Sequence, residues 1–304
     1  MRFTLIDIGS NSVKCNLYEQ KGALRPLLSQ SRTVGLIRYV AQGCLSDSGL
    51  KALLDVLSEY LSLSNEMGCE AVYAVATAAL RGLDNREQVL CAIRDVGCHV
   101  RIISGQEEAM LGYRAAMATT EMPKKGILVD LGGASTELSA YEDGRLVQFV
   151  SLPMGCLRLY RDHVSHVLPT EKERNAIRDR VKELLAPLPF LKEYGTHLTL
   201  IGGTAKTIGR LIAAEDGIDY ENGMRVGRDR LRALKKAYHN PSRERIGRLV
   251  DLAPDRLHTL VPGLVAYHTL AKACDAADLT LSFAGIRDGL AYDIVNGRWK
   301  EDVM

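Results

Sequence analysis

The chain has 304 residues, of which 46% are hydrophobic and 25% charged, and its formal net charge is +2. This length accommodates two domains, each with its own core, and the composition is that of an ordinary globular protein. The small net charge argues against the strongly basic class of nucleic-acid-binding and membrane-surface proteins, so we expect no nucleic-acid partner.

The cysteines and the apolar segments indicate where the protein resides. Its seven cysteines form no C-x-x-C pair. Scattered cysteines of this kind are typical of thiols in a reducing compartment, not of a disulfide or zinc framework. Asp7 follows the first residue closely, which leaves no room for a secretory signal segment, and no apolar run reaches the about eighteen residues of a membrane span. We therefore expect a cytoplasmic protein without a membrane partner.

The first third of the chain predicts three strands, then a helix, a strand, a helix and a strand. In chain order these lie at residues 3–9, 12–19, 23–30, 47–68, 71–76, 84–96 and 98–103. The run at 71–76 is continuously apolar, as in a strand buried on both faces. A meander of three strands followed by alternating helix and strand predicts a mixed sheet with helices on its faces.

A further helix opens at Ser104 and is predicted to run towards Met117. Ser104 and Glu107 have capping-box spacing, which accounts for Glu107 in structural terms. Glu108 has no capping role. It is equally open to two interpretations, a residue of a solvated helix face and a functional carboxylate. The polar, proline-containing segment 119–125 predicts a domain boundary, which divides the chain into residues 1–121 and 122–304.

The second half repeats the pattern of the first. Strands are predicted near 126–131, 135–142, 145–152, 198–201 and 278–283, with a capping-box helix at Thr170 and a final helix from Ile286. Gly202-Gly203-Thr204 turns the strand at 198–201 into a helix. This turn is either a phosphate or nucleotide contact or a close strand–helix crossing.

A basic run extends from Arg225 to Arg248, with nine basic residues against Asp229 and Glu244. It is open to two interpretations, a track that attracts a polyanion and an ordinary solvated helix face. The seven histidines show neither metal-ligand spacing nor a Ser-His-Asp arrangement.

One stretch occurs twice. Residues 5–19 align without a gap onto residues 128–142 at a constant offset of 123 (130 − 7 = 123). A period this long indicates a duplicated domain. In each copy a strand ends in an aspartate and a glycine turn follows, and turn N–H groups beside a carboxylate suit a phosphate and its metal ion. Two such turns facing each other across a cleft would hold one phosphate chain.

Six motifs distributed over nearly the whole chain match a known family. They are Ile6-Asp7-Ile8-Gly9-Ser10-Asn11-Ser12, Ala76-Thr77-Ala78-Ala79-Leu80-Arg81, Ser104-Gly105-Gln106-Glu107-Glu108-Ala109, Val129-Asp130-Leu131-Gly132-Gly133-Ala134-Ser135-Thr136-Glu137-Leu138, Leu152-Pro153-Met154-Gly155 and Ile201-Gly202-Gly203-Thr204. Through them the chain resembles the exopolyphosphatase/guanosine pentaphosphate phosphohydrolase (Ppx/GppA) family of the actin, sugar-kinase and Hsp70 superfamily.

The resemblance implies an α/β fold of two duplicated ribonuclease-H-like (actin-like ATPase) domains, each a mixed five-stranded sheet with helices on both faces. It leaves open that the last helix packs back on the first domain. It also implies Mg²⁺-dependent hydrolysis of a terminal phosphoanhydride bond in the interdomain cleft. Larger members carry additional C-terminal helical domains, and this chain resembles the two-domain core.

The resemblance also assigns roles to residues. Glu108 matches the general base that deprotonates the attacking water, and Glu137 matches a second essential carboxylate. Asp7 and Asp130 would hold Mg²⁺. The phosphate-binding set consists of Ser10, Asn11, Ser12, Lys14, Arg81, Gly132, Gly133, Ala134, Ser135, Gly203 and Thr204.

Two positions depart from the family pattern. Ala134 stands where a third glycine is usual, and a positive φ there would cost about 1 kcal/mol. Lys14 stands where arginine is also frequent, and it remains a cation that can bind phosphate.

Several functions fit this set of residues. The first is an exopolyphosphatase acting on inorganic polyphosphate, and the alternative substrate is guanosine pentaphosphate (pppGpp), which shares the reacting group. A catalytically weak regulator that binds alarmone or polyphosphate belongs to a different class, and the Ser-Gly-Gln-Glu-Glu motif disfavours a kinase. Chain-length preference and oligomeric state stay open, with a homodimer as one alternative.

Overall fold

The computed structural model describes residues 1–299, and the chain divides into two compact units, each with its own sheet. The first unit contains Met1–Leu111 and the chain from Ile286 onward, and the second contains Gly112–Gly285. The division falls inside helix α4 (Gly105–Thr119). The domain boundary expected after Glu121 lies beyond the end of that helix and stays a prediction.

The first unit contains a five-stranded mixed sheet, as predicted, with strand order β3-β2-β1-β6-β7. β1 runs antiparallel to β2 and parallel to β6. The strands are β1 (Arg2–Ile8), β2 (Ser12–Lys21), β3 (Ala23–Thr33), β6 (Ala71–Ala76) and β7 (Val100–Ile102), and the short elements η1 (Leu36–Tyr39), β4 (Val40–Ala41) and β5 (Cys44–Leu45) follow β3.

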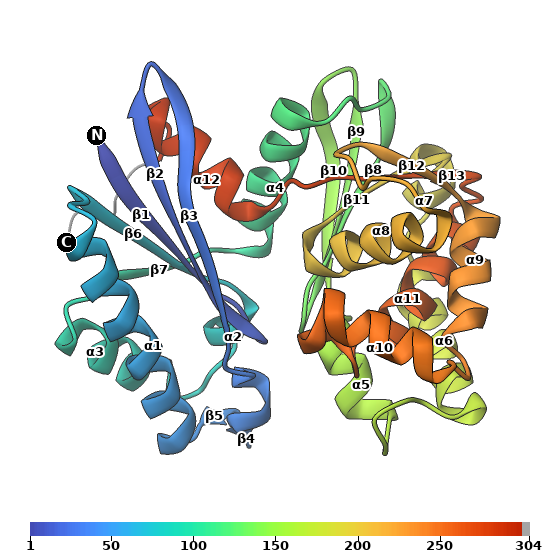
Figure 1. Ribbon diagram of the computed structural model, residues 1–304, viewed down its shortest axis with the longest axis horizontal. Helices are drawn as coiled ribbons and strands as arrows, with labels where there is room; N and C mark the ends of the chain where they lie inside the picture. Colours follow the sequence, from blue (N-terminus) through green and yellow to red (C-terminus); the bar gives the residue numbers. More distant parts are fainter. Residues whose placement is uncertain (300–304) are drawn as a thin grey trace. The chain divides into compact units, whose positions relative to one another are not determined.

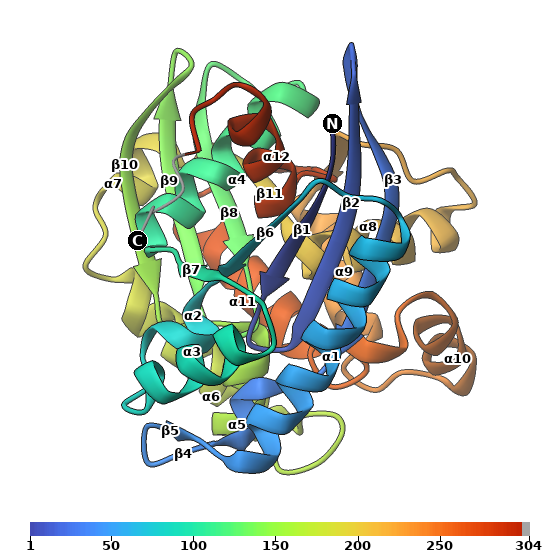
Figure 2. The ribbon, with the colours of Figure 1, turned by 90° about the vertical axis from the view of Figure 1, so that its left-hand side faces the viewer.

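Helices cover both faces of this sheet (Figure 1, Figure 2). Alternation along β1 sends Ile6 into a core with Leu53 of α1 and sends Leu5 into a separate core with Leu290 of α12. The helices of this unit are α1 (Asp47–Glu66), α2 (Ala78–Arg81), α3 (Arg86–Asp95), the first part of α4, and α12 (Ile286–Val295).

The second unit repeats this strand order and adds one strand, giving a six-stranded sheet of order β10-β9-β8-β11-β13-β12. The strands are β8 (Lys125–Leu131), β9 (Thr136–Glu142), β10 (Arg145–Leu152), β11 (His197–Ile201), β12 (Met224–Gly227) and β13 (Asp278–Leu281). The expectation of five strands is wrong here. The extra strand β12 has four residues, too few for a clear alternation. It is antiparallel to β13, which follows after three α-helices and one 3₁₀ helix.

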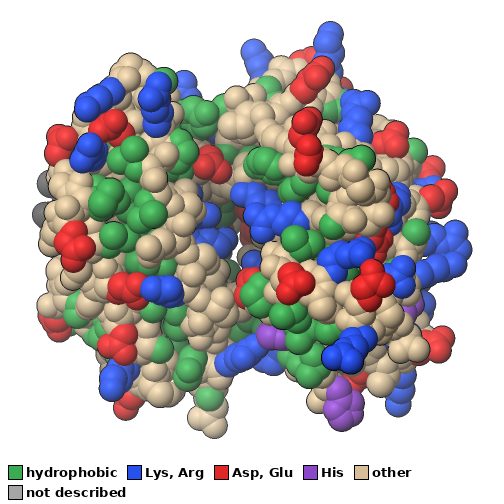
Figure 3. Space-filling view, in the orientation of Figure 1, with side chains coloured by type: hydrophobic (Ala, Val, Ile, Leu, Met, Phe, Trp, Pro, Cys, Tyr) green, Lys and Arg blue, Asp and Glu red, His purple; other side chains and the backbone are tan. Residues whose placement is uncertain are grey.

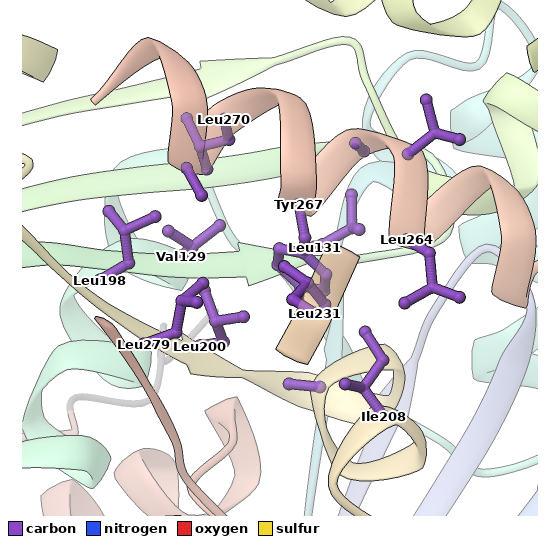
Figure 4. Close-up of a cluster of buried hydrophobic side chains, with 14 of the residues drawn as sticks. Val129, Leu131, Leu198, Leu200, Ile208, Leu231, Leu264, Tyr267, Leu270 and Leu279 are labelled. Atoms are coloured by element: carbon purple, nitrogen blue, oxygen red, sulfur yellow. The ribbon is translucent and has the colours of Figure 1, made fainter. Parts of the chain in front are cut away.

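The largest core of the second unit lies between its sheet and the helices on one face (Figure 4). Val129 and Leu131 of β8 pack there with Tyr267 of α11. On the opposite face, Leu128 packs with Tyr113 of α4. The helices are α5 (Cys156–His163), α6 (Glu171–Leu185), α7 (Phe190–Tyr194), α8 (Gly202–Asp216), α9 (Arg228–Ala237), α10 (Arg243–Leu252), η2 (Pro254–Arg256) and α11 (Leu260–Ala273). The α/β fold with helices on both faces of each sheet is thus confirmed.

Local signals read from the sequence are also confirmed. Ser104 and Glu107 exchange hydrogen bonds at the start of α4, and Thr170 and Glu173 form a complete capping box on α6. All seven cysteines lie in the described part of the chain and are free thiols. No helix within residues 1–299 is long and apolar enough to cross a membrane.

Candidate active site

The first predicted phosphate loop, Gly9 to Ser12, connects β1 to β2. The Gly9 N–H donates to the Ser12 carbonyl over 3.1 Å, which closes the turn. The carbonyl oxygens of Ser10 and Asn11 accept hydrogen bonds from backbone N–H groups of residues 34–37 at 2.7–3.1 Å. The N–H groups of Ser10 and Asn11 donate to no residue that the structure describes. The loop therefore keeps its donors available for an anion.

Two buried side chains accompany this loop. Asp7, near the end of β1, is 7% exposed and lies opposite Lys14 of β2. Asn11 is also 7% exposed, and its Nδ2 has no hydrogen-bond partner among the described residues. Since buried polar groups are nearly always satisfied, this amide is suited to donate to a ligand oxygen.

Glu108 lies in the first turn of α4 and is paired with Arg81, the last residue of α2. The Arg81 Nη2 donates to the Glu108 Oε2, and the side chain of Glu108 is only 5% exposed. A solvated helix face, one of the two interpretations of Glu108, is thereby excluded. Arg81 is 29% exposed, and its guanidinium has further N–H groups that suit a phosphate.

The second predicted phosphate loop, Gly132 to Ser135, has the same construction as the first. Its Gly132 N–H donates to the Ser135 carbonyl over 3.0 Å. The carbonyl oxygens of Gly132 and Gly133 accept hydrogen bonds of 2.9–3.0 Å from backbone N–H groups of residues 156–158 at the start of α5. The N–H groups of Gly133, Ala134 and Ser135 donate to no described residue. The hydrogen bond that closes the turn thus repeats at the offset of 123, and so does the accepting carbonyl of Ser10 at Gly133.

Gly155 explains why a glycine ends the Leu152-Pro153-Met154-Gly155 motif. A Cβ at Gly155 would lie 2.2 Å from the Gly133 carbonyl carbon and 2.3 Å from the Ala134 nitrogen. The backbone before α5 therefore supports the loop directly. Ala134 is not among the described residues with positive φ, and its side chain is buried. The strain considered for Ala134 does not arise.

Asp130 of β8 and Glu137 of β9 are direct cross-strand partners, at the positions that correspond to Asp7 and Lys14. Glu137 is 4% exposed and accepts a hydrogen bond of 2.7 Å from the Ser151 hydroxyl. A Cβ at Gly202 would lie 2.6 Å from the Asp130 Oδ1, and the φ of Gly202 is +86°. Asp130 thus lies close to the N-terminus of α8.

The third glycine turn shows the close strand–helix packing that was one of its two interpretations. The Thr204 side chain is 2% exposed, and its hydroxyl donates to the Cys156 Sγ over 3.7 Å. A Cβ at Gly203 would lie 2.4 Å from the Arg256 Nη2. Phosphate binding by Gly203 and Thr204 stays a prediction.

Sequence reasoning missed three residues near the second loop. Arg256 lies against Gly203, and the Nε of Arg158 is buried without a hydrogen-bond partner among the described residues. Burial, and after it the Asp130 carboxylate, raise the pKa of Tyr267 well above its usual range. Its hydroxyl donates to the Ile201 carbonyl over 3.5 Å. None of the six family motifs lies near Arg256 or Tyr267 in the sequence.

The side chains present fit Mg²⁺ better than they fit a metal ion whose ligands are all protein side chains. Within residues 1–299 there is no group of three or more His, Cys, Asp and Glu residues that could hold a metal ion. Mg²⁺ commonly takes one or two carboxylates and completes its shell with water and substrate phosphates. Asp130 and Glu137 would supply carboxylate oxygens on one face of the second sheet, and Asp7 would supply them in the first unit.

A family model described as the Ppx/GppA phosphatase family matches residues 17–297. The chain belongs to this family. A solved structure of an Aquifex aeolicus member is 27% identical, with 99% of each chain covered and a TM-score of 0.81. A solved exopolyphosphatase from Cytophaga hutchinsonii ATCC 33406 shares the fold at a TM-score of 0.88, with 20% identity and 98% of each chain covered. The resemblance drawn from the motifs is confirmed.

Proposed function

We propose that this Ppx/GppA member is an Mg²⁺-dependent exopolyphosphatase that hydrolyses the terminal phosphoanhydride bond of inorganic polyphosphate. The observation that carries the proposal is the doubled loop. In each unit an aspartate precedes a turn whose carbonyl oxygens are bound by the chain itself and whose N–H groups are left for a ligand. A substrate made only of linked phosphates offers anionic oxygens to a loop of this kind.

Cations would bind the substrate beside these loops. Arg81 would bind phosphate oxygens through the N–H groups that Glu108 does not use. Lys14 would add a point charge, and the Asn11 amide would donate one neutral hydrogen bond. Because phosphoryl transfer depends mainly on positioning and charge neutralisation, these groups account for most of what the reaction needs.

In the proposed step, a water oxygen attacks the terminal phosphorus. The new O–P bond forms as the bond from that phosphorus to the bridging oxygen breaks, and the shortened chain leaves with the electron pair. The Glu108 carboxylate takes the proton of the water. The ion pair with Arg81 fixes the position of this carboxylate.

In the second unit Asp130 and Glu137 would hold Mg²⁺, and in the first unit Asp7 is a further carboxylate suited to this ion. The ion, when bound, would neutralise charge on the phosphate oxygens. The hydroxyl of Ser151 orients Glu137 through its hydrogen bond, and the N-terminus of α8 lies close to Asp130.

The test is phosphate release with Mg²⁺ from polyphosphates of defined length and from guanosine pentaphosphate, for the wild type and Glu108→Gln. We expect release from polyphosphate and a loss of at least about 100-fold in kcat in the variant. Substrate binding, measured separately without turnover, should be retained.

Other outcomes would replace the proposal. Release from guanosine pentaphosphate alone would make the nucleotide the substrate. Binding of both without hydrolysis of either would indicate a regulator. Wild-type turnover in Glu108→Gln would remove the general-base role from Glu108.

A further inference from the structure

The basic run of the sequence contributes to a cationic patch formed by three helices of the second unit. The patch comprises Arg178 of α6, Arg232, Lys235 and Lys236 of α9, and His268 and Lys272 of α11. Both α6 and α9 pack against α11. Figure 3 shows Lys and Arg side chains gathered over α9, at the right-hand edge of the view.

Lys235 lies at the centre of this patch and is only partly exposed. Its Nζ is 3.1 Å from the Nδ1 of His268. Burial, and after it Arg232, Lys272, Arg178 and Lys236, lower the pKa of Lys235. A half-buried ammonium among cations is unfavourable unless an anion joins it.

His268 adds a hydrogen-bond donor. Burial and the neighbouring Lys235 lower the pKa of His268 to about 4, so its ring is neutral at pH 7. Because the ammonium of Lys235 can only donate, the Nδ1 of His268 accepts, and its Nε2 carries the hydrogen. The patch therefore combines positive charges with a neutral N–H donor, a combination that suits phosphate oxygens.

Among the described residues, four cations of the patch lack the acidic partners that a solvated helix face normally has, whereas Arg178 is paired with Asp179. Within residues 1–299, no carboxylate forms an ion pair with Arg232, Lys235, Lys236 or Lys272. Four other cations of the basic run do form ion pairs: Arg228 with Asp275, Arg230 with Glu215 and Asp216, Arg245 with Glu215, and Arg248 with Glu244. The interpretation as a track for a polyanion thus applies to one part of the basic run, and the interpretation as a solvated helix face applies to another part.

The patch is separate from the second phosphate loop. Gly263 faces Thr204 near that loop. His268 and Lys272 follow Gly263 on α11, about 140° and about 180° around the helix from it at about 100° per residue. Lys272 also lies about 14 Å further along the axis. A short substrate at the loop would not reach it.

We propose that the cationic patch is a second binding site for linear inorganic polyphosphate, which holds long chains while their ends are hydrolysed elsewhere. The proposal rests on the proposed function for the choice of ligand. Charge complementarity supports it, because a polyphosphate chain offers a regular series of anionic oxygens to side chains that lack acidic partners.

The test compares a patch variant, Arg232→Gln/Lys236→Gln/Lys272→Gln, with a charge-matched control, Arg25→Gln/Lys51→Gln/Arg94→Gln. All six side chains are exposed, so both variants should fold. Binding of fluorescently labelled long-chain polyphosphate is measured in EDTA. The KM and kcat for long-chain polyphosphate and for triphosphate are measured with Mg²⁺.

We expect the patch variant to bind long chains about 5- to 10-fold more weakly, with a similar rise in KM for long chains only, and kcat unchanged. The control should match the wild type. Equal binding by the two variants would overturn the proposal. Single-stranded RNA that displaces polyphosphate from the wild type at equal or lower phosphate concentration would overturn the choice of ligand. A wild type that does not hydrolyse polyphosphate refutes the proposed function, while the binding comparison still decides about the patch.

Discussion

Asp130 and Glu137 lie directly opposite each other on β8 and β9, so two acidic side chains share one face of the second sheet. In the first unit the same register places Asp7 opposite Lys14. Like charges opposite each other in a sheet are destabilising, and a bound cation removes that cost. The same aspartate thus lies opposite a lysine in one copy of the hairpin and opposite a glutamate in the other.

Mg²⁺ should stabilise the wild type more than it stabilises Asp130→Asn. An ion that binds only the native state contributes about 2.7 kcal/mol at a hundred times its Kd. The variant loses one carboxylate ligand, so we expect its gain to fall by at least about 1 kcal/mol. Thermal unfolding with and without MgCl₂ measures the difference. Asp143→Asn, in the β9–β10 turn, is the control and should keep the full gain. An equal gain in stability with MgCl₂ in all three proteins would show that Asp130 is not a ligand of the metal ion.

Arg81→Ala should destabilise the protein by about 3 kcal/mol, because it leaves the buried Glu108 carboxylate without its guanidinium partner. The double variant Arg81→Ala/Glu108→Gln should recover part of that loss and remain inactive. Urea unfolding of the four proteins gives the coupling energy. For comparison, Arg86→Ala removes an exposed pair with Glu87 and should change stability by less than about 0.5 kcal/mol. A coupling energy near zero would contradict the importance of the buried pair.

Gly155→Ala should displace the second phosphate loop, since its Cβ would meet the backbone of Gly133 and Ala134. We expect a loss of about 2 kcal/mol in stability and a raised KM for substrate. Gly247→Ala in α10 has open space around the new Cβ and should stabilise by about 0.5 kcal/mol. Thermal unfolding and steady-state kinetics check both variants. An unchanged KM in Gly155→Ala would show that this contact does not determine the position of the second phosphate loop.

Glu173 should make the stability of the protein depend on pH in the acid range. The Ser165 hydroxyl, with the backbone N–H groups of Thr170 and Ser165, lowers the pKa of Glu173 to about 2. This stabilisation is present above the usual glutamate pKa of about 4.3 and is lost as the pH falls towards about 2. Glu173→Gln should therefore lose less stability than the wild type between pH 5 and pH 2, as urea midpoints would show. Glu183→Gln, on the same helix, should behave as the wild type, and an identical profile for all three would contradict the prediction.

The sequence predicted best those features that depend on residues close together in the chain. The two aspartate–glycine turns, the strands beside them and the capping boxes depend on residues within a few positions of each other, and the structure confirms their geometry. The contact between Gly203 and Arg256 joins distant parts of the chain, and no spacing rule could predict it. The strand β12 was missed because four residues carry too little pattern.

The role of Gly132 depends on packing and not on an unusual backbone conformation. Gly132 is not among the described glycines with positive φ. Its hydrogen bond to Ser135 and the approach of Gly155 to the same loop reflect close packing of backbone on backbone. Such packing involves a partner beyond the turn itself, so a short motif could not reveal it.

Each loop and the N–H groups that bind its carbonyl oxygens come from one continuous stretch of chain, residues 9–37 in the first unit and 132–158 in the second. A duplicated gene segment of that size transmits the loop together with its support. The copies were then free to diverge at single side chains such as Lys14 and Glu137 without losing the loop. A binding element inherited in this form depends little on the sequence that surrounds it.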